Sequence, residues 1–392
     1  MRRVLVIAYY TPPLGLSGVM RVTKLCKYLP EFGWRPVVLT VKPPAYYHYD
    51  HSLLKDLDAS RVYRTESADP ARLINRFRPV RSRLSPALYP GLGKVHRLLN
   101  YLLFPDSKVG WFPFGSVSGR HVVDQEKPSA IFATAPPFTS LLLGVRLKAH
   151  ARLPLVADFR DPWPTGFAEP PRHLRAPLRA IRRYVVRHAD AVLAVNRGTA
   201  DMVGSGVRIL DNGFDPEDFD AAAEKLEGFS VLHVGNVWQN EAALEDVARA
   251  IAQVPDGRLY LAGRFAEPMR RTLERNDRIG LLGTLPHGRA CRLMKGADIL
   301  LYLGKPGQPV GIKLYEYLGA SRPILVYGPD TSEAADLVSE SGSGLECQSS
   351  GDIAQALLRL RDTAGPPAIV GRARFDRREQ AGRLARLFES LV

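Results

Sequence analysis

The sequence has few cysteines, no long apolar run and no G-x-G-x-x-G motif after its first apolar segment. The three cysteines, Cys26, Cys291 and Cys347, are far apart and form no C-x-x-C pair, which disfavours a disulfide framework or a zinc site and favours a reducing compartment. The missing glycine motif disfavours a dinucleotide-binding dehydrogenase. No stretch approaches the roughly 18 to 20 apolar residues of a membrane span.

The apolar run at the N-terminus is short and ends at Thr11-Pro12-Pro13 without a small-residue cleavage site. We interpret it as a buried first strand rather than a signal peptide. The expected location is therefore cytoplasmic, with peripheral attachment to the inner face of the cell membrane as a further possibility.

Length and charge indicate two domains with different surfaces. A chain of 392 residues with 45% hydrophobic and 24% charged residues fits a globular protein of two domains. Residues 1–200 carry 31 Lys and Arg against 13 Asp and Glu, whereas residues 201–392 carry 23 against 27. Two basic stretches lie within 72–97 and 171–188, and each is either a solvated helix face or a surface for lipid head groups, a phosphorylated acceptor or nucleic acid.

Strand and helix patterns alternate along the chain, which predicts α/β domains with parallel sheets covered on both faces. We predict an N-terminal, acceptor-side domain over 1–208, a C-terminal, donor-binding domain over 209–375, and a last helix over 376–392 that crosses back to the first domain. Ligands of open parallel sheets bind beyond the carboxyl ends of the strands. The predicted site is therefore the cleft between the two domains.

Polar or glycine-rich segments follow three strands of the predicted first domain. Gly15 and Gly18 bracket a loop that opens a helix, and this is either an anion-binding loop or a plain tight turn. The segment D-F-R-D, 158–161, holds two carboxylates and a guanidinium, either as a salt bridge that shapes the loop or as a cluster that orients a hydroxyl nucleophile. Thr134 follows another strand and is expected to face the same cleft.

A helix in the second half begins with a glycine and an unusual charge pattern. Gly311 allows a close approach of the backbone to a ligand, and Lys313 falls in the first helical turn, where a cation opposes the helix dipole. Lys313 and the free N–H groups of that turn would suit a diphosphate, and Glu316 could accept hydrogen bonds from a ribose diol. The alternative is a surface ion pair between Lys313 and Glu316.

Four segments together resemble glycosyltransferase family 4, which has the GT-B fold. They are Y-Y-T-P-P-L-G-L-S-G-V-M-R (9–21), A-D-F-R-D-P-W (157–163), I-L-D-N-G-F-D-P-E-D-F (209–219) and G-I-K-L-Y-E-Y-L-G-A-S-R-P-I-L (311–325). The resemblance covers nearly the whole chain. It implies two Rossmann-like β/α domains with an interdomain cleft, and a retaining enzyme of the type that builds bacterial surface polysaccharides.

The resemblance also implies roles for individual residues, with Glu316 holding the ribose of the donor. The predicted donor-binding residues are Gly15, Gly18, Asn236, Arg264, Gly311, Lys313, Leu314 and Glu316. The predicted catalytic residues are Asp161, Asp158 and Arg160, which would position the acceptor, and the predicted acceptor-side residues are Thr134 and Arg21.

The sequence departs from the family pattern at the phosphate and sugar contacts. Gln308 stands where the family often has a glutamate, and Asn236 stands where many members have an arginine. Many members also carry a histidine near the strand that leads into 158–161, and this chain has none there. We therefore expect the phosphate charge to rest on Lys313 and the Gly15–Gly18 loop, with Arg264 or Arg21 as further candidates. The departures leave the sugar-contacting residue unassigned.

The predicted reaction moves a sugar from a nucleoside diphosphate sugar, with UDP favoured, to a hydroxyl of a lipid-linked or polysaccharide acceptor. No cofactor or metal is expected, because helix N-termini and Lys313 can stabilise the leaving diphosphate and neither D-x-D motif (56–58, 218–220) follows an apolar strand. A sugar-nucleotide 2-epimerase of the same fold is the alternative. Nucleic-acid binding is disfavoured because the basic stretches lack interleaved aromatic residues.

The stretch 171–188 predicts an amphipathic helix. Leu174, Leu178, Ile181 and Val185 fall on one face, and arginines occupy much of the remainder. The helix either packs on its own domain or, together with 72–97, binds an anionic membrane surface.

Overall fold

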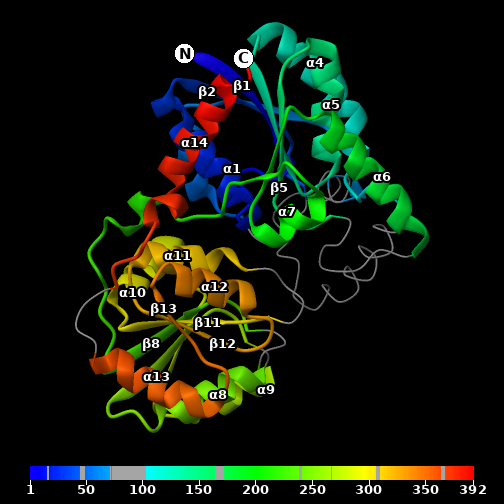
Figure 1. The fold of residues 1–392 in the computed structure, drawn as a ribbon. Helices are drawn as coiled ribbons and strands as arrows, with labels where there is room; N and C mark the ends of the chain where they lie inside the picture. The colour runs from blue at the N-terminus through cyan, green and yellow to red at the C-terminus, as the bar shows by residue number, and fades with distance from the viewer. Residues whose placement is uncertain are drawn as a thin grey trace. The chain divides into compact units, whose positions relative to one another are not determined.

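The computed structural model describes residues 1–15, 17–44, 49–70, 72, 103–163, 172–237, 241–265, 267–305, 310–362 and 367–392. These residues form two compact units (Figure 1). Unit 1 contains Met1–Asn212 and Arg377–Val392, and unit 2 contains Gly213–Asp376. The division falls four residues beyond the predicted boundary at 208, and the last helix belongs to the unit that contains the N-terminus.

Unit 1 is built on a parallel sheet of seven strands among its described residues, in the order β3-β2-β1-β4-β5-β6-β7. The strands are β1 (Arg2–Ile7), β2 (Trp34–Val41), β3 (Arg61–Thr65), β4 (Ala130–Ala135), β5 (Leu155–Phe159), β6 (Ala191–Ala194) and β7 (Arg208–Ile209). The α-helices are α1 (Ser17–Tyr28), α4 (Phe112–Glu126), α5 (Thr139–Ala151), α6 (Arg172–His188), α7 (Arg197–Val203) and α14 (Arg377–Glu389).

The central strands of unit 1 are apolar on both faces because helices cover both. All six residues of β4 are buried, and two separate apolar clusters lie on the two sides of the sheet. Helix α14 completes one of these layers and lies beside α1 (Figure 1). Its Phe388 is fully buried, with its ring centroid 5.1 Å from that of Trp34. This burial explains why the chain's last helix packs with its first elements.

Unit 2 repeats the plan with a parallel sheet of six strands among its described residues, in the order β10-β9-β8-β11-β12-β13. The strands are β8 (Phe229–Val234), β9 (Gly257–Ala262), β10 (Ile279–Gly283), β11 (Ile299–Leu303), β12 (Ile324–Tyr327) and β13 (Gly344–Glu346). The α-helices are α8 (Glu241–Ile251), α9 (Glu267–Leu273), α10 (His287–Gly296), α11 (Ile312–Ala320), α12 (Ser332–Glu340) and α13 (Ser350–Asp362).

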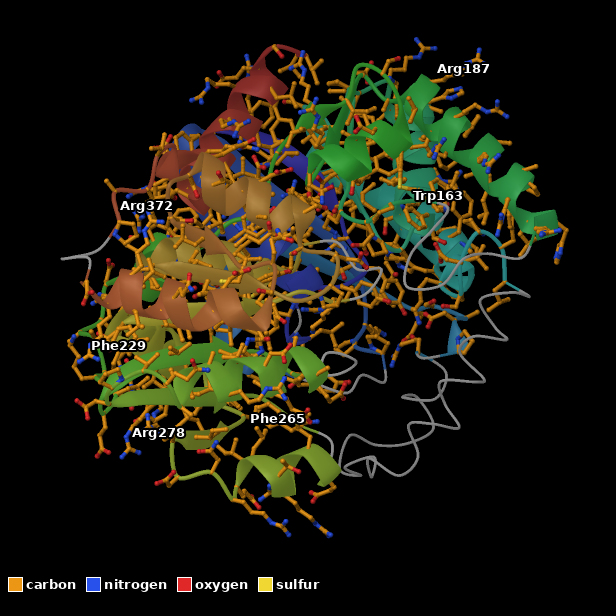
Figure 2. All side chains as sticks on the ribbon, turned by 60° about the horizontal axis from the view of Figure 1, so that its bottom comes forward. Trp163, Arg187, Phe229, Phe265, Arg278 and Arg372 are labelled. Carbon is orange, nitrogen blue, oxygen red and sulfur yellow. The ribbon has the colours of Figure 1, made fainter. Side chains whose placement is uncertain are left out.

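Helix α6 confirms the amphipathic pattern predicted for 171–188 and shows where its apolar face goes. Leu178 and Val185 are buried, and Leu174 and Ile181 pack against the core of unit 1. Arg187, labelled in Figure 2, is exposed near the C-terminal end of the helix. The apolar face thus packs on its own unit, and the exposed face is basic. The other basic stretch, 72–97, lies outside the described residues apart from Arg72. No helix in the described ranges is long and apolar enough to span a membrane.

Candidate active site

The chain order of the sheet in unit 1 reverses between β1 and β4. Helical connections leave these two strands in opposite directions, and such a switch point is where open α/β sheets bind ligands. The loop after β1, which contains Gly15, leads into helix α1, which begins at Ser17. The neighbouring strands β4 and β5 end at Ala135 and Phe159, so 158–161 lies at the same edge of the sheet, as predicted.

Three of the predicted site residues of unit 1 instead form a buried network. Arg21 donates to both carboxylate oxygens of Asp158, from Nη2 at 2.8 Å and from Nε at 3.1 Å, and also to the Asp211 carbonyl. Thr134 Oγ1 donates to the same carboxylate at 2.7 Å. The three residues are at most 1% exposed. In this structure Arg21, Asp158 and Thr134 join α1 to the ends of β4 and β5, and their predicted contact with substrate stays a prediction.

Arg160 holds together the loops around the switch point. Its guanidinium donates to the Ala135 carbonyl at 3.2 Å, to the Pro136 carbonyl at 2.6 Å and to the Gly18 carbonyl. Burial lowers the pKa of this guanidinium, opposed by the charges of Asp161 and Asp158. A Cβ on Gly18 would lie 3.0 Å from Arg160 Nη1. Gly18 therefore lets the guanidinium approach the start of α1, and Arg160 joins the loops through three backbone carbonyls.

Asp161 is the carboxylate of this cluster that remains accessible. Its side chain is half-buried, and it has no hydrogen-bond partner among the described residues. Burial raises the pKa of Asp161, and the Arg160 charge opposes this effect without cancelling it. The loop is anchored two residues later by Trp163 (Figure 2), which stacks on Phe138 at 4.2 Å. Of the predicted catalytic residues, Asp161 is thus the one that can reach a substrate.

The switch point of unit 2 lies between β8 and β11. Glycines stand just beyond β8 and β9, where the backbones of the two loops come very close. A Cβ on Gly263 would lie 2.0 Å from the Gly235 carbonyl oxygen, and Gly263 has a positive φ of 151°. Only glycine fits there without moving the backbone. Gly235 and Gly263 thus form a tightly packed surface at the strand ends of unit 2, called the glycine surface below.

Helix α11 contacts the end of β8, where Tyr317 Oη accepts a hydrogen bond from the Val234 N–H at 2.8 Å, and it carries the predicted donor-binding pair. Gly311 is its N-cap, with its N–H bonded to Tyr302 Oη at 3.0 Å, and the next two N–H groups have no partner inside the helix. Lys313 Nζ lies 2.5 Å from Glu316 Oε2, and the two side chains are 34% and 8% exposed. Burial alone would lower the pKa of Lys313, but the Glu316 carboxylate raises it. The structure thus contains the ion pair that the sequence left as the alternative.

The remaining predicted donor-binding residues differ in accessibility. Asn236 and Arg264 are both exposed, and Asn236 Oδ1 accepts a hydrogen bond from the Arg264 backbone N–H at 2.9 Å. Leu314 is fully buried in the core of unit 2. Leu314 could contact a ligand only through its backbone.

An ion pair that the sequence did not predict lies next to Glu316. His287, the first residue of α10, is 2.9 Å from Asp218 Oδ2, and Cys291 Sγ is 3.6 Å from the same imidazole nitrogen. Burial alone would lower the pKa of His287, but the hydrogen bond with Asp218, together with Cys291 and Glu316, raises it to about 11. The D-x-D motif that begins at Asp218 gives no sign of this pair, because no local pattern links Asp218 to a partner 69 residues away.

Two further residues at the β8/β11 switch point were missed. His233 Nδ1 lies 2.9 Å from the Leu301 carbonyl oxygen, and its Nε2 is buried without a hydrogen-bond partner among the described residues. Lys305 lies two residues beyond the end of β11 and is half-buried. The rule that ligand contacts follow strands would have identified Lys305, had it been applied to the run that ends at Leu303. Within the described ranges, no group of three or more His, Cys, Asp or Glu residues could hold a metal ion.

Comparisons with known families agree with this architecture. Residues 18–208 match the family model described as "Glycosyl transferase 4-like domain", and residues 228–363 match "Glycosyl transferases group 1". A GDP-mannose:cellobiosyl-diphosphopolyprenol alpha-mannosyltransferase from Xanthomonas campestris is 26% identical over 217 residues. That match covers 49% of this chain and 56% of the relative, so the chain spans little more than half the length of that relative.

Solved structures share the fold over the whole chain. Anabaena HepE in complex with UDP and glucose has a TM-score of 0.62 at 15% identity, with 100% of both chains covered. A glycosyltransferase from Rickettsia africae has a TM-score of 0.66 at 12% identity, covering 100% of this chain and 98% of that one. At these identities the likeness concerns the fold alone.

Proposed function

Because this chain belongs to the glycosyltransferase 4-like enzymes of the GT-B fold, we propose that it transfers a sugar from a UDP-sugar to a hydroxyl of a lipid-linked or polysaccharide acceptor. The observation that carries the donor assignment is in unit 2. There, Gly235 and Gly263 follow β8 and β9, and α11, which carries Glu316, is bonded to the end of β8 through Tyr317 and to Tyr302 of β11 through the Gly311 N–H. HepE was solved with UDP and the mannosyltransferase relative is named for GDP-mannose, so both support a nucleoside diphosphate sugar, for which we propose UDP as the nucleotide. The acceptor class is supported by the mannosyltransferase relative, whose acceptor is a diphosphopolyprenol.

The chemistry requires stabilisation of a departing nucleoside diphosphate. The first-turn N–H groups of α11 can donate to it, and cations at the strand ends can balance its charge. Asp161 would orient the acceptor hydroxyl in unit 1. We propose that the reaction retains the anomeric configuration and needs no metal. Nothing in this scheme requires nucleic acid.

Transfer is tested by incubating the protein with UDP-sugars and a polyprenyl-diphosphate-linked sugar in the presence of EDTA. The expected result is a glycosylated lipid whose new bond keeps the anomeric configuration of the donor, as read by NMR. Interconversion of donor sugars without any acceptor product would show an epimerase instead. Activity that is lost with EDTA and restored by Mg²⁺ would exclude the metal-independent mechanism.

Replacing Glu316 with alanine should weaken UDP binding by roughly 1.5 to 3 kcal/mol, the range for hydrogen bonds to a charged group. The loss should disappear for 2′,3′-dideoxy-UDP, because that ligand lacks the diol that Glu316 is proposed to hold. Calorimetry with both ligands measures this difference. Glu340→Ala removes an exposed carboxylate on α12 and serves as the control. Equal losses for both ligands would contradict the ribose contact.

We also propose a cytoplasmic enzyme that binds anionic membranes through α6. Arg179, Arg183 and Arg187 are exposed on this helix, whereas Arg182 is half-buried and donates to the Trp163 carbonyl. A Lys or Arg near an anionic leaflet gains about 1 kcal/mol. Changing the three exposed arginines to glutamine should therefore reduce vesicle binding by about 3 kcal/mol, roughly a hundredfold.

Co-sedimentation with phosphatidylglycerol vesicles over a salt series measures this binding. The control changes three exposed arginines elsewhere, Arg208, Arg271 and Arg275, to glutamine. The same loss in both triple variants would show an effect of net charge rather than of α6. A wild-type protein that stays in the supernatant at low salt would exclude the membrane proposal.

A further inference from the structure

The proposed donor site of unit 2 needs a cation that balances the charge of the diphosphate. A nucleoside diphosphate carries negative charge that needs cations beside it. Lys313 was the predicted cation, but its ammonium lies 2.5 Å from Glu316 Oε2. Asn236 is uncharged, and Arg264 is exposed at the end of β9. We therefore expect the phosphate-binding cation among the residues that follow β8 and β11.

Lys305 meets this requirement by position. It comes two residues after Leu303, the last residue of β11, and so stands at the edge of the sheet where the chain order reverses. Gly304 fixes the start of this loop: its N–H bonds to the Tyr327 carbonyl at 2.9 Å, and a Cβ there would lie 2.1 Å from the Pro329 carbonyl oxygen. The backbone that presents Lys305 is thus held firmly by the neighbouring β12 loop.

The charge of Lys305 is not balanced by any described carboxylate. Its side chain has no ion-pair or hydrogen-bond partner among the described residues. Burial lowers the pKa of Lys305, and no opposing negative charge within those residues offsets this effect. Lys313, by contrast, has its pKa raised by Glu316. Partial burial of an ammonium group without a counter-charge costs free energy unless a bound anion balances its charge.

His233 provides a second, independent observation at the same place. Its ring is 5% exposed, and Nδ1 donates to the Leu301 carbonyl of β11 at 2.9 Å, which leaves Nε2 as an acceptor in the neutral ring. Burial, with Lys305 adding to it, lowers the pKa of His233 to about 4. Nε2 has no partner among the described residues and lies 3.2 Å from the position that a Gly235 Cβ would occupy. An unsatisfied hydrogen-bond acceptor thus points at the glycine surface next to Lys305, where a hydroxyl of a bound nucleotide sugar could donate to it while Lys305 binds the phosphate.

We infer that Lys305 is the phosphate-binding cation of the donor site, acting beside the unpartnered imidazole of His233 at the β8/β11 switch point. This inference rests on the proposed function, since it assigns a residue to the diphosphate of the proposed donor. Lys313 then keeps Glu316 in place, and Lys305 supplies the positive charge that Asn236 lacks. The two lysines would have different ligands: a carboxylate for Lys313 and a phosphate for Lys305.

The test compares the affinities of wild type and Lys305→Gln for uridine, UMP and UDP by calorimetry. Lys305→Gln should weaken UDP binding at least about tenfold, the lower end for a charge-assisted contact, and leave uridine binding unchanged. Lys305→Arg should retain most of the UDP affinity because it keeps the charge. Lys225→Gln, which removes an exposed lysine of unit 2, is the control for net charge.

Three results of this calorimetry would overturn the assignment of Lys305 to the phosphate. Unchanged UDP affinity in Lys305→Gln would overturn this inference alone, because the wild type would still bind the nucleotide. Equal weakening of uridine and UDP would show a structural role and overturn it as well. If the wild type bound neither UDP nor GDP, the donor proposal itself would fail and this inference with it.

Discussion

Replacing Asp158 with asparagine is expected to lower the free energy of unfolding of unit 1 by about 3 to 5 kcal/mol, the cost of breaking a buried ion pair by removing one partner. Asparagine has nearly the same shape but no charge. It would remove the negative charge that pairs with the Arg21 guanidinium, which is 1% exposed and has Asp158 as its ion-pair partner among the described residues. Thr134 would also lose a charged acceptor.

Urea unfolding at pH 7, followed by tryptophan fluorescence, measures this loss. Three of the four tryptophans, Trp34, Trp111 and Trp163, lie in unit 1 and are nearly fully buried, so the signal reports mainly on that unit. Arg21→Gln should show a loss of similar size. A stable Asp158→Asn variant that had lost only its activity would contradict the structural role and restore the original catalytic assignment.

The fold class could be predicted from the sequence because it follows from the alternation of strand and helix patterns. Apolar strands alternate with helices in both halves, and this pattern specifies parallel sheets covered on both faces. Strand β3 and helices α4 and α5 were not predicted. Helix α4 contains two glycines and a proline, which weaken a helical pattern. Its glycines are explained only by packing, since a Cβ on Gly115 would lie 2.6 Å from Leu143.

The candidate site could be predicted only in part, and the contacts that the sequence did not predict have one cause. The position of segments 158–161 and 311–316 beyond the strands that precede them could be predicted, because it follows from chain position alone. Which side chains are buried there depends on partners far away in the chain. Asp158 pairs with a residue 137 positions earlier, and His287 pairs with one 69 positions earlier. No local spacing reports such contacts, so Arg21 and Asp158 were assigned to a substrate and His287 was overlooked.

Asp161 should behave in the opposite way from Asp158, although only three positions separate them. Asp161→Asn is expected to lower kcat by about 100-fold to 10,000-fold, the usual contribution of a positioned acid or base. Its carboxylate is the accessible one of the cluster, and nothing among the described residues occupies it by a hydrogen bond. Steady-state transfer assays at saturating donor measure the change, with Asp190→Asn, an exposed aspartate of the same unit, as the control.

The free energy of unfolding of Asp161→Asn should also differ from that of Asp158→Asn. Because burial raises the pKa of Asp161, the folded protein holds this proton more tightly than the unfolded chain does. The carboxyl group therefore favours folding at low pH, and this contribution is lost as pH rises through the raised pKa. At neutral pH the ionised group costs stability, and asparagine removes that cost. Asp161→Asn should thus unfold at the same or a higher urea concentration than wild type. A variant that lost activity only because it had unfolded would show that Asp161, like Asp158, maintains the loop rather than orients the acceptor.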